Sequence, residues 1–217
     1  MNLAIFDLDN TLLAGDSDYL WGEYLCEQGH IDAADHRERH LGFYEDYRAG
    51  RLDIHRFLDF QLQPLAGVEL EVLHARRDEY LENKIRPIIL DKARNLIEDH
   101  KQKGHELLII TATNDFLTRP IAELLGVDNL IATTAELVNG NYTGRHVGVP
   151  SYREGKVIRY NDWLDKHGIK PRETWFYSDS HNDLPLLHIV DHPVAVDPDG
   201  NLKEIAVEKG WPVISLR

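Results

Sequence analysis

The chain has 217 residues, of which 42% are hydrophobic and 28% are charged, and its formal net charge is −13. These values are typical of a globular protein with a full core, and 24 basic against 37 acidic residues argue against nucleic-acid binding, which needs clustered Lys and Arg. No apolar run approaches the ~20 residues that cross a bilayer, and the N-terminus shows no signal-peptide pattern. The single cysteine, Cys26, excludes an internal disulfide and fits a reducing cytoplasm. We therefore expect a cytoplasmic protein, and the charge and hydropathy given above predict no nucleic-acid or membrane partner.

Residues 3–13 join a short apolar run to a polar end. Leu3–Phe6 has β-branched and aromatic members, which predicts a buried strand of a parallel sheet. Asp7 and Asp9 follow, and an extended backbone points both side chains to the same side. Ligands of open α/β sheets bind beyond such strand ends, and two close carboxylates repel unless a cation or a shared proton intervenes. We therefore expect a functional site here; the alternative is a strand end followed by an Asx turn.

Residues 15–85 show helical patterns only. Asp16 or Ser17 is placed to cap a first amphipathic helix. Residues 30–52 are dense in charge, which indicates a solvated helix, and Asp53 begins a further pattern of apolar residues at helical spacing. Since no stretch alternates like a strand, we expect an all-helical domain inserted into another domain.

From residue 86 onward, strand and helix patterns alternate. Helices are expected at 91–103, 115–125, 154–167 and 201–209, strands at 106–113, 130–132 and from 174 onward, and a last strand with its turn at 192–200. The Asn139–Gly140 pair between apolar segments predicts a β-hairpin. Alternating strands and helices imply right-handed crossovers and a parallel sheet. We predict an α/β fold: a three-layer sandwich with a parallel, Rossmann-like sheet, formed by residues 1–14 and 86–217.

Polar clusters end three of the predicted strands. They are Asp7, Asp9 and Thr11; Thr111, Thr113 and Asn114; and Ser178, Asp179, Asn182 and Asp183. Lys156 follows Gly155 near the start of a predicted helix. In a parallel sheet these ends converge on one edge. Several acids with one lysine and hydroxyl donors describe a cation site facing a phosphate site, and Mg²⁺ is typically held by one or two carboxylates together with phosphate and water.

In this order the motifs resemble those of the haloacid dehalogenase (HAD) superfamily of phosphotransferases. DLDNT at 7–11 resembles the first motif, and ITAT at 110–113 supplies the threonine of the second. REGKV at 153–157 supplies a lysine ahead of the acidic motif SDSHND at 178–183. The insertion at 15–85 resembles the small helical cap of the phosphoserine phosphatase-like branch. The resemblance covers the whole chain, and four ordered motifs are far more specific than any one alone.

The resemblance implies a Mg²⁺-dependent phosphatase that forms an aspartyl-phosphate intermediate. Asp7 would be the nucleophile, and Asp9 would be the general acid and then the general base. Asp7, the backbone carbonyl of Asp9, and Asp179 would hold the metal ion, while Asn182 and Asp183 would support that set. The phosphoryl oxygens would be bound by Thr111, the backbone amide of Ala112, and Lys156.

Each residue also has a purely structural interpretation when it is taken alone. Thr111 is equally a strand-end hydroxyl, and a lone Lys156 is more often a solvated helix residue. Asp179 and Asp183 precede a helical pattern, where acids also serve as caps. Only the joint order of the motifs favours function. Asp9 also favours phosphoryl transfer over dehalogenation, because the dehalogenases of the superfamily lack an acid at this position. The P-type pumps of the superfamily need membrane helices, which this sequence does not show.

The predicted cap would contact the substrate through Asp16, Tyr19 and Arg48, with Asp18, Trp21 and Arg51 as further candidates. In phosphoserine phosphatases an acid near the position of Asp16 faces the substrate ammonium, and a cap arginine holds the carboxylate. Against phosphoserine, Ala112–Thr113 stands where the family has Gly-Gly, which removes a close backbone approach.

An acidic, aromatic cap mouth would suit an amine-bearing alcohol phosphate. The expected function is therefore a phosphoserine phosphatase-like hydrolase of a small phosphomonoester, with a histidinol-phosphate phosphatase or a broad-range phosphatase as alternatives. A non-catalytic module that binds a phospho-ligand is the alternative of another class. The expected partner is a small phosphorylated metabolite, and the protein is expected to be a monomer or a homodimer.

Overall fold

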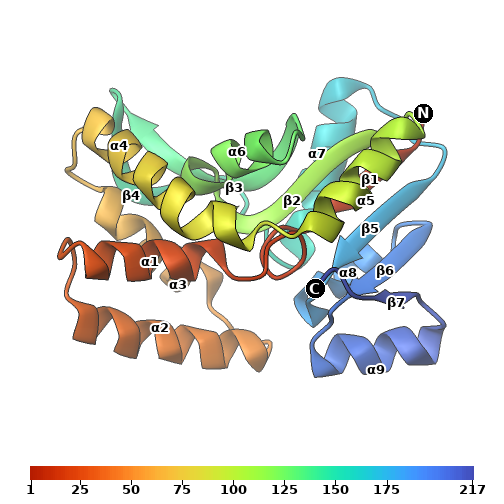
Figure 1. The fold of residues 1–217 in the computed structure, drawn as a ribbon, viewed down its shortest axis with the longest axis horizontal. Coiled ribbons are helices and arrows are strands. Elements are labelled where there is room, and N and C mark those ends of the chain that lie inside the picture. Colours follow the sequence, from red (N-terminus) through yellow and green to blue (C-terminus); the bar gives the residue numbers. More distant parts are fainter.

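The centre of the molecule is a seven-stranded sheet in the order β4-β3-β2-β1-β5-β6-β7, and the computed structural model describes all residues from 1 to 217 (Figure 1). Its strands are β1 (Leu3–Phe6), β2 (Glu106–Asn114), β3 (Asn129–Val138), β4 (Asn141–Val147), β5 (Thr174–Ser178), β6 (His192–Val196) and β7 (Val213–Ile214). β1 lies in the middle and pairs in parallel with β2 and β5. Only β3 and β4 are antiparallel. The predicted α/β fold with its mostly parallel sheet is confirmed.

The sheet is buried on both faces because its strands send alternate side chains into two apolar clusters. In β1, Ala4 and Phe6 belong to one cluster and Leu3 and Ile5 to the other, and all four are fully buried. The first cluster includes residues of α5 (Asp91–Gln102) and α6 (Asp115–Leu124), together with residues of the helices between β1 and α5. The helices that complete the second cluster are α7 (Glu154–His167), α8 (Leu184–Leu187) and α9 (Gly200–Lys209). Burial on both faces explains why the first strand is a continuous apolar run without polar alternation.

Between β1 and α5 the chain forms helices beside the β3–β4 hairpin (Figure 1). They are α1 (Ser17–Glu27), α2 (Ala33–Arg48), α3 (Ile54–Leu62) and α4 (Leu70–Tyr80), followed by short helical turns to Ile88. We call residues 17–85 the helical segment. Asp16 caps α1 by accepting a hydrogen bond from the backbone N–H of Tyr19 at 2.9 Å. His36 is the only buried residue of α2, so this helix is solvated as predicted.

Close backbone contacts and hydrogen bonds join the helical segment to the rest of the chain. Gly144 of β4 has a φ of +79°, and a Cβ there would lie 3.1 Å from the Cβ of Ala66, so the absence of a side chain allows a close approach. Arg77 donates a hydrogen bond to the carbonyl of Phe116 at 3.1 Å. The Arg153 guanidinium donates to the carbonyl of Gly50 at 2.9 Å. These contacts hold the helical segment next to the polar ends of the strands.

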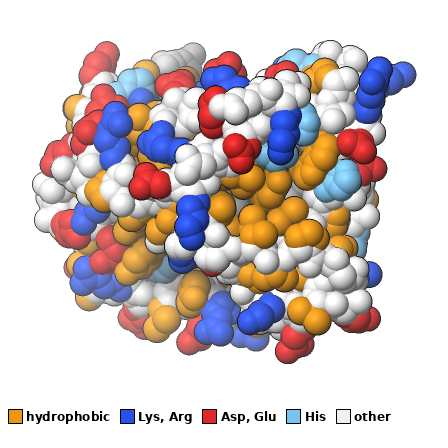
Figure 2. Space-filling model, turned by 45° about the vertical axis from the view of Figure 1, so that its right-hand side comes forward, with side chains coloured by type: hydrophobic (Ala, Val, Ile, Leu, Met, Phe, Trp, Pro, Cys, Tyr) orange, Lys and Arg blue, Asp and Glu red, His pale blue; other side chains and the backbone are white.

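Two strands differ from the expectation. β3 extends well beyond the predicted residues 130–132, because its second half pairs with β4 across the predicted hairpin, where Asn139 and Gly140 both have positive φ. The two-residue strand β7 was not predicted, since so short a segment carries no periodicity. Figure 2 shows hydrophobic side chains gathered on the side of the molecule that carries β5 to β7, and Trp175 of β5 packs there against the first cluster. None of the helices is long and apolar enough to cross a bilayer.

Candidate active site

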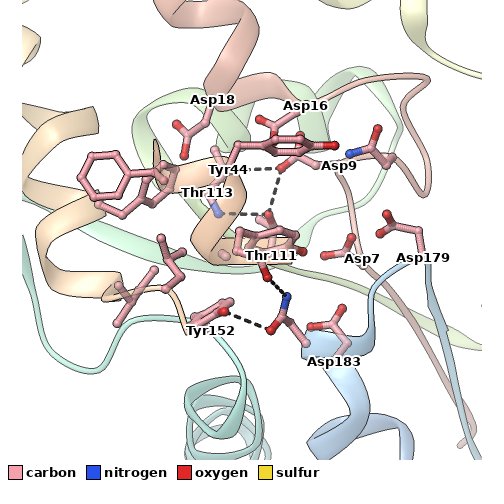
Figure 3. Close-up of a pocket in the computed structure, with 18 of the residues that line it drawn as sticks. Asp7, Asp9, Asp16, Asp18, Tyr44, Thr111, Thr113, Tyr152, Asp179 and Asp183 are labelled. Carbon is pink, nitrogen blue, oxygen red and sulfur yellow. Dashed lines mark hydrogen bonds between the residues drawn. The ribbon is translucent and has the colours of Figure 1, made fainter. Parts of the chain in front are cut away.

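The carboxyl ends of β1, β2 and β5 open into one cavity of about 110 Å³, which the helical segment closes from the other side (Figure 3). Nine of the predicted site residues line it: Asp7, Asp9, Asp16, Thr111, Ala112, Lys156, Asp179, Asn182 and Asp183. The convergence arises because β1 pairs in parallel with both β2 and β5, so their following loops leave the sheet on the same edge. The three motifs that follow strands are therefore neighbours in space, although they are far apart in the sequence.

Lys156 lies at the phosphate end of the cavity, in the first turn of α7. The preceding Gly155 is required there, because a Cβ would collide with the carbonyl oxygen of Pro150. The Lys156 Nζ lies 2.8 Å from Oδ1 of Asp7 and 2.7 Å from Oδ1 of Asp183, and only 3% of its side chain is exposed. Although burial opposes a charged lysine, the two carboxylates raise its pKa, so Lys156 remains protonated.

Asp7 and Asp179 face one another across the hydroxyl of Thr11. The Thr11 Oγ1 lies 3.2 Å from Oδ2 of Asp7 and 3.3 Å from Oδ1 of Asp179, and it accepts a hydrogen bond from the Asp179 N–H at 3.1 Å. Burial raises the pKa of Asp7 to about 7, although Lys156 opposes this shift. Burial and the charges of Asp7 and Asp183 raise the pKa of Asp179 well above its usual range.

Asp7 and Asp183 thus share one lysine, Asp179 lies beside Asp7 without a cationic partner, and the excess negative charge favours a bound cation. No group of three or more His, Cys, Asp or Glu side chains is arranged to coordinate a metal ion by itself. Mg²⁺ does not need such a group, because it is commonly held by one or two carboxylates with phosphate and water. The two carboxylates next to Thr11, which have no lysine or arginine partner apart from Lys156, fit this kind of site.

Asp9 is held in a different way from Asp7. Its Oδ1 accepts a hydrogen bond from the N–H of Ser17 at 2.7 Å, and its Oδ2 accepts one from Oγ1 of Thr113 at 2.8 Å. Burial and the charge of Asp16 raise the pKa of Asp9 to about 6, while these hydrogen bonds lower it. A carboxyl group whose pKa is raised toward neutral pH is suited to general acid catalysis.

The remaining predicted residues of the core lie around these acids. Thr111 places its Oγ1 3.5 Å from Oδ2 of Asp9, and Ala112 follows it along the cavity wall. Asn182 accepts a hydrogen bond from the Tyr152 hydroxyl at 3.0 Å (Figure 3). Asp183 accepts one from the Ser178 hydroxyl at 2.7 Å, in addition to its contact with Lys156. The roles assigned to these residues from the sequence stay predictions.

The structure does not bring all the predicted substrate contacts of the helical segment to the cavity. Asp16 lines it, but Tyr19 is exposed outside it and packs its ring on His40. Arg48 is also exposed and outside the cavity, since α2 turns it toward a separate surface pocket. The further candidates Arg51 and Trp21 lie elsewhere too: Arg51 forms an ion pair with Asp46, and Trp21 packs in the core against Tyr24 and Tyr80.

Several lining residues have no role in the sequence interpretation. They are Thr113, His40, Phe43, Tyr44, Tyr47, Leu52, Ile54, Phe57 and Tyr152. Asp18, a weaker candidate, is buried in the cavity wall and accepts a hydrogen bond from Asn114 Nδ2 at 3.2 Å. The signal that could have found the aromatic residues is the recurrence of Phe43, Tyr44 and Tyr47 in an otherwise charged helix. Aromatic side chains on a solvated helix suggest a ligand or partner contact.

A sequence model of the haloacid dehalogenase-like hydrolases matches residues 4–188, and the chain belongs to this family. It is 46% identical to a histidinol-phosphatase of Neisseria meningitidis serogroup C, over 100% of this chain and 99% of that one. It is 32% identical to the phosphoserine phosphatase SerB1 of Mycobacterium tuberculosis, over 99% of this chain and 70% of that one. The predicted superfamily and its phosphoserine phosphatase-like character are confirmed, and the protein is a phosphoric monoester hydrolase rather than a non-catalytic module.

Solved structures agree with the fold. A crystal structure of a Bordetella pertussis protein, described as having unknown function, superposes with a TM-score of 0.94 at 43% identity, covering 100% of this chain and 99% of that one. A phosphoserine phosphatase solved as an analogue of its phospho-aspartyl intermediate gives a TM-score of 0.71 at 18% identity, covering 100% and 93%. The second match supports the fold alone, because the sequences are distant.

Proposed function

We propose that this protein is a Mg²⁺-dependent phosphatase that hydrolyses histidinol phosphate through an aspartyl-phosphate intermediate. The observation that supports this choice of substrate is the charge of the cavity lining. It contains the aspartates Asp7, Asp9, Asp16, Asp18, Asp179 and Asp183, whereas its only lysine or arginine is Lys156. Because Lys156 already contacts Asp7 and Asp183, no cation remains to bind a substrate carboxylate. A substrate that carries an ammonium group fits this lining, and the relative named histidinol-phosphatase supports the same choice.

In the first step, one carboxylate oxygen of Asp7 attacks phosphorus and the bond to the alcohol oxygen breaks. The attack requires the ionised form of Asp7, which the ammonium of Lys156 at 2.8 Å favours. We propose that the hydroxyl of Thr111 and the backbone N–H of Ala112 donate hydrogen bonds to the phosphoryl oxygens. These donors stabilise the charge that builds up in the transition state.

Asp9 moves the protons in both steps. It gives its proton to the leaving alkoxide, and the resulting carboxylate then takes a proton from the water that attacks the aspartyl-phosphate. The hydrogen bonds from Ser17 and Thr113 hold its carboxyl group in one orientation, so it does not swing toward Lys156. This separation of Asp9 from the lysine explains why two aspartates so close in sequence can serve different roles.

We propose that Mg²⁺ is held by Asp7, Asp179 and the backbone carbonyl of Asp9. Asn182 and Asp183 would hold these ligands in the orientation that binds the ion. The bound ion supplies positive charge that offsets the repulsion between an anionic nucleophile and an anionic phosphate. We also propose that residues 15–85 act as a cap domain over the core formed by residues 1–14 and 86–217. The cap would exclude water and supply the residues that contact the alcohol.

Phosphoserine is the alternative substrate, because its phosphatases are relatives of this chain. It carries a carboxylate as well as an ammonium group. The arginine that the sequence suggested for that carboxylate, Arg48, lies outside the cavity. The lining would therefore repel the carboxylate of phosphoserine, while histidinol phosphate, which has an imidazolylmethyl group in its place, avoids this repulsion.

The test is a steady-state comparison of histidinol phosphate, phosphoserine and p-nitrophenyl phosphate, each with Mg²⁺ and with EDTA. We expect the highest kcat/KM for histidinol phosphate and no turnover in EDTA. Asp7→Asn removes the attacking oxygen's charge and should lower kcat by about 10³-fold or more for every substrate. Unfolding curves of Asp7→Asn serve as the control for folding. A kcat/KM for phosphoserine equal to or above that for histidinol phosphate would contradict the substrate, and turnover by Asp7→Asn at the parent rate would contradict the mechanism.

A further inference from the structure

The end of the cavity farthest from Lys156 is formed by aromatic rings of the helical segment. Phe43 and Tyr44 come from α2 and Phe57 from α3, and all three line the cavity. Phe43 and Phe57 meet edge to face, with ring centroids 5.5 Å apart, so one ring presents its face where the other presents its edge. Phe43 and Phe57 thus form a continuous wall, and Tyr44 lines the same cavity from the residue next to Phe43.

These rings are not explained by the packing of the core. Phe43 and Phe57 are only half-buried, and Tyr44 is 50% exposed. α2 is otherwise a charged helix with a single buried residue, His36, and of the three rings only Phe43 packs against a buried ring, that of Phe60 at 5.3 Å. Leaving three aromatic side chains at the surface of a cavity costs hydrophobic free energy that a bound apolar group would recover. The arrangement therefore points to a ligand rather than to folding.

The charge beside the rings narrows the ligand further. Tyr44, Asp9 and Asp16 lie next to one another in Figure 3, and all three line the cavity. Asp18 lines the same cavity and is buried, and no lysine or arginine other than Lys156 reaches the lining. Aromatic faces next to carboxylates attract flat groups that carry a positive charge or polar N–H donors. An imidazole ring next to an ammonium group combines these properties.

We propose that Phe43, Tyr44 and Phe57 form a subsite for the planar ring of the leaving alcohol and select substrates that carry such a ring. The subsite deepens the proposed function, on which it rests for the placement of the phosphate at Asp7. It also explains why a helix of the cap carries aromatic residues where the solvent would favour polar ones. An amino alcohol phosphate without a ring would leave these aromatic side chains exposed to water and would bind less tightly.

The experiment compares two matched substrates, histidinol phosphate and L-alaninol phosphate, which share the phosphate and the ammonium group and differ in the ring. The parent should prefer histidinol phosphate by at least about tenfold in kcat/KM. Phe57→Leu keeps an apolar side chain but removes the flat ring, so it should lower this preference about fivefold, mainly through KM. Phe57→Tyr keeps the ring and should retain the preference. Phe43→Leu is the second variant, and unfolding curves check that each variant is folded.

The outcomes separate the subsite from the proposed function. Equal kcat/KM values of the parent for both substrates would overturn the subsite and leave the phosphatase mechanism intact, as would a preference unchanged in both leucine variants. If the parent hydrolysed p-nitrophenyl phosphate but neither amino alcohol phosphate, the proposed substrate would be wrong. Inhibition of that hydrolysis by free histidinol and by alaninol then decides the subsite: weaker inhibition by histidinol in Phe57→Leu than in the parent supports it, and equal inhibition overturns it.

Discussion

The two ends of the cavity are built in opposite ways. At the phosphate end, Lys156, Asp7 and Asp183 come from the α/β core, are almost fully buried, and are held by ion pairs of 2.7–2.8 Å. At the other end, the rings of Tyr44 and Phe57 come from the helical segment, stay partly exposed, and make no side-chain hydrogen bond. Phosphoryl transfer depends on exact placement of charges, whereas choosing among alcohols depends on the shape and polarity of a wall. The comparison shows how one reaction centre can serve different substrates.

The largest expected effect is at Lys156. Lys156→Met leaves Asp7 and Asp183 buried together without a cation, which should destabilise the protein by about 3–5 kcal/mol and abolish turnover. Urea unfolding in EDTA at pH 8 measures the first effect, because EDTA removes any divalent ion that would replace the lost positive charge. The double variant Lys156→Met/Asp183→Asn removes the second charge and should regain part of the loss. A change in unfolding free energy below about 1 kcal/mol would mean that the phosphate end is not held by this ion cluster.

A smaller, pH-dependent effect is expected at Asp18, which is buried in the cavity wall. Burial and the charges of Asp16 and Asp9 raise its pKa well above 3.8. Between pH 4 and the raised pKa, the folded state therefore binds more protons than the unfolded state, and stability falls as the pH rises. Relative to Asp18→Asn, which cannot ionise at this position, the free energy of unfolding of the parent should fall by up to about 1.4 kcal/mol per pH unit in this range.

Urea unfolding from pH 4 to pH 8 measures this difference. Asp78→Asn, at an exposed position of α4, is the control for the substitution itself. A stability difference between the parent and Asp18→Asn that does not change with pH would show that Asp18 is solvated and that the cavity wall is looser than the structure indicates.

The smallest effect is expected at Arg48. Its side chain is exposed and outside the cavity, and its guanidinium carbon lies 6.0 Å from the ring centroid of Tyr44. Arg48→Ala should therefore change kcat/KM for histidinol phosphate less than about twofold, since this solvent-exposed side chain does not line the cavity. The measurement repeats the steady-state assay beside Phe57→Leu. A tenfold loss of activity would restore Arg48 as a substrate contact and would place the boundary of the cavity farther out along α2.

The sequence predicts the core end of the site well because each motif is local. The strand Leu3–Phe6 and its two aspartates are neighbours along the chain, and the Gly155–Lys156 pair marks the start of its helix without help from other elements. The parallel topology then follows from the alternation of strands and helices. The short strand β7 and the second half of β3 were missed because pairing partners, rather than local patterns, produce them.

The helical segment was harder to predict in detail. Its helices, the cap at Asp16 and the solvated character of α2 follow from composition and spacing. Which of its side chains reach the cavity does not, because this depends on how α2 and α3 are rotated against the core. Trp21 illustrates the difficulty: it stands close to Asp16 and Asp18 in the sequence, yet it packs on Tyr80 in the core.

By itself, the sequence determined the α/β sheet and the set of residues that can carry out phosphoryl transfer, because strand ends and helix starts are encoded by neighbouring residues. Only the tertiary structure decided that a single lysine is shared by two buried aspartates and that Phe43 and Phe57 face the cavity in place of Arg48. These features arise from packing between segments that are distant along the chain, such as Gly144 against Ala66. Local patterns carry no information about such distances.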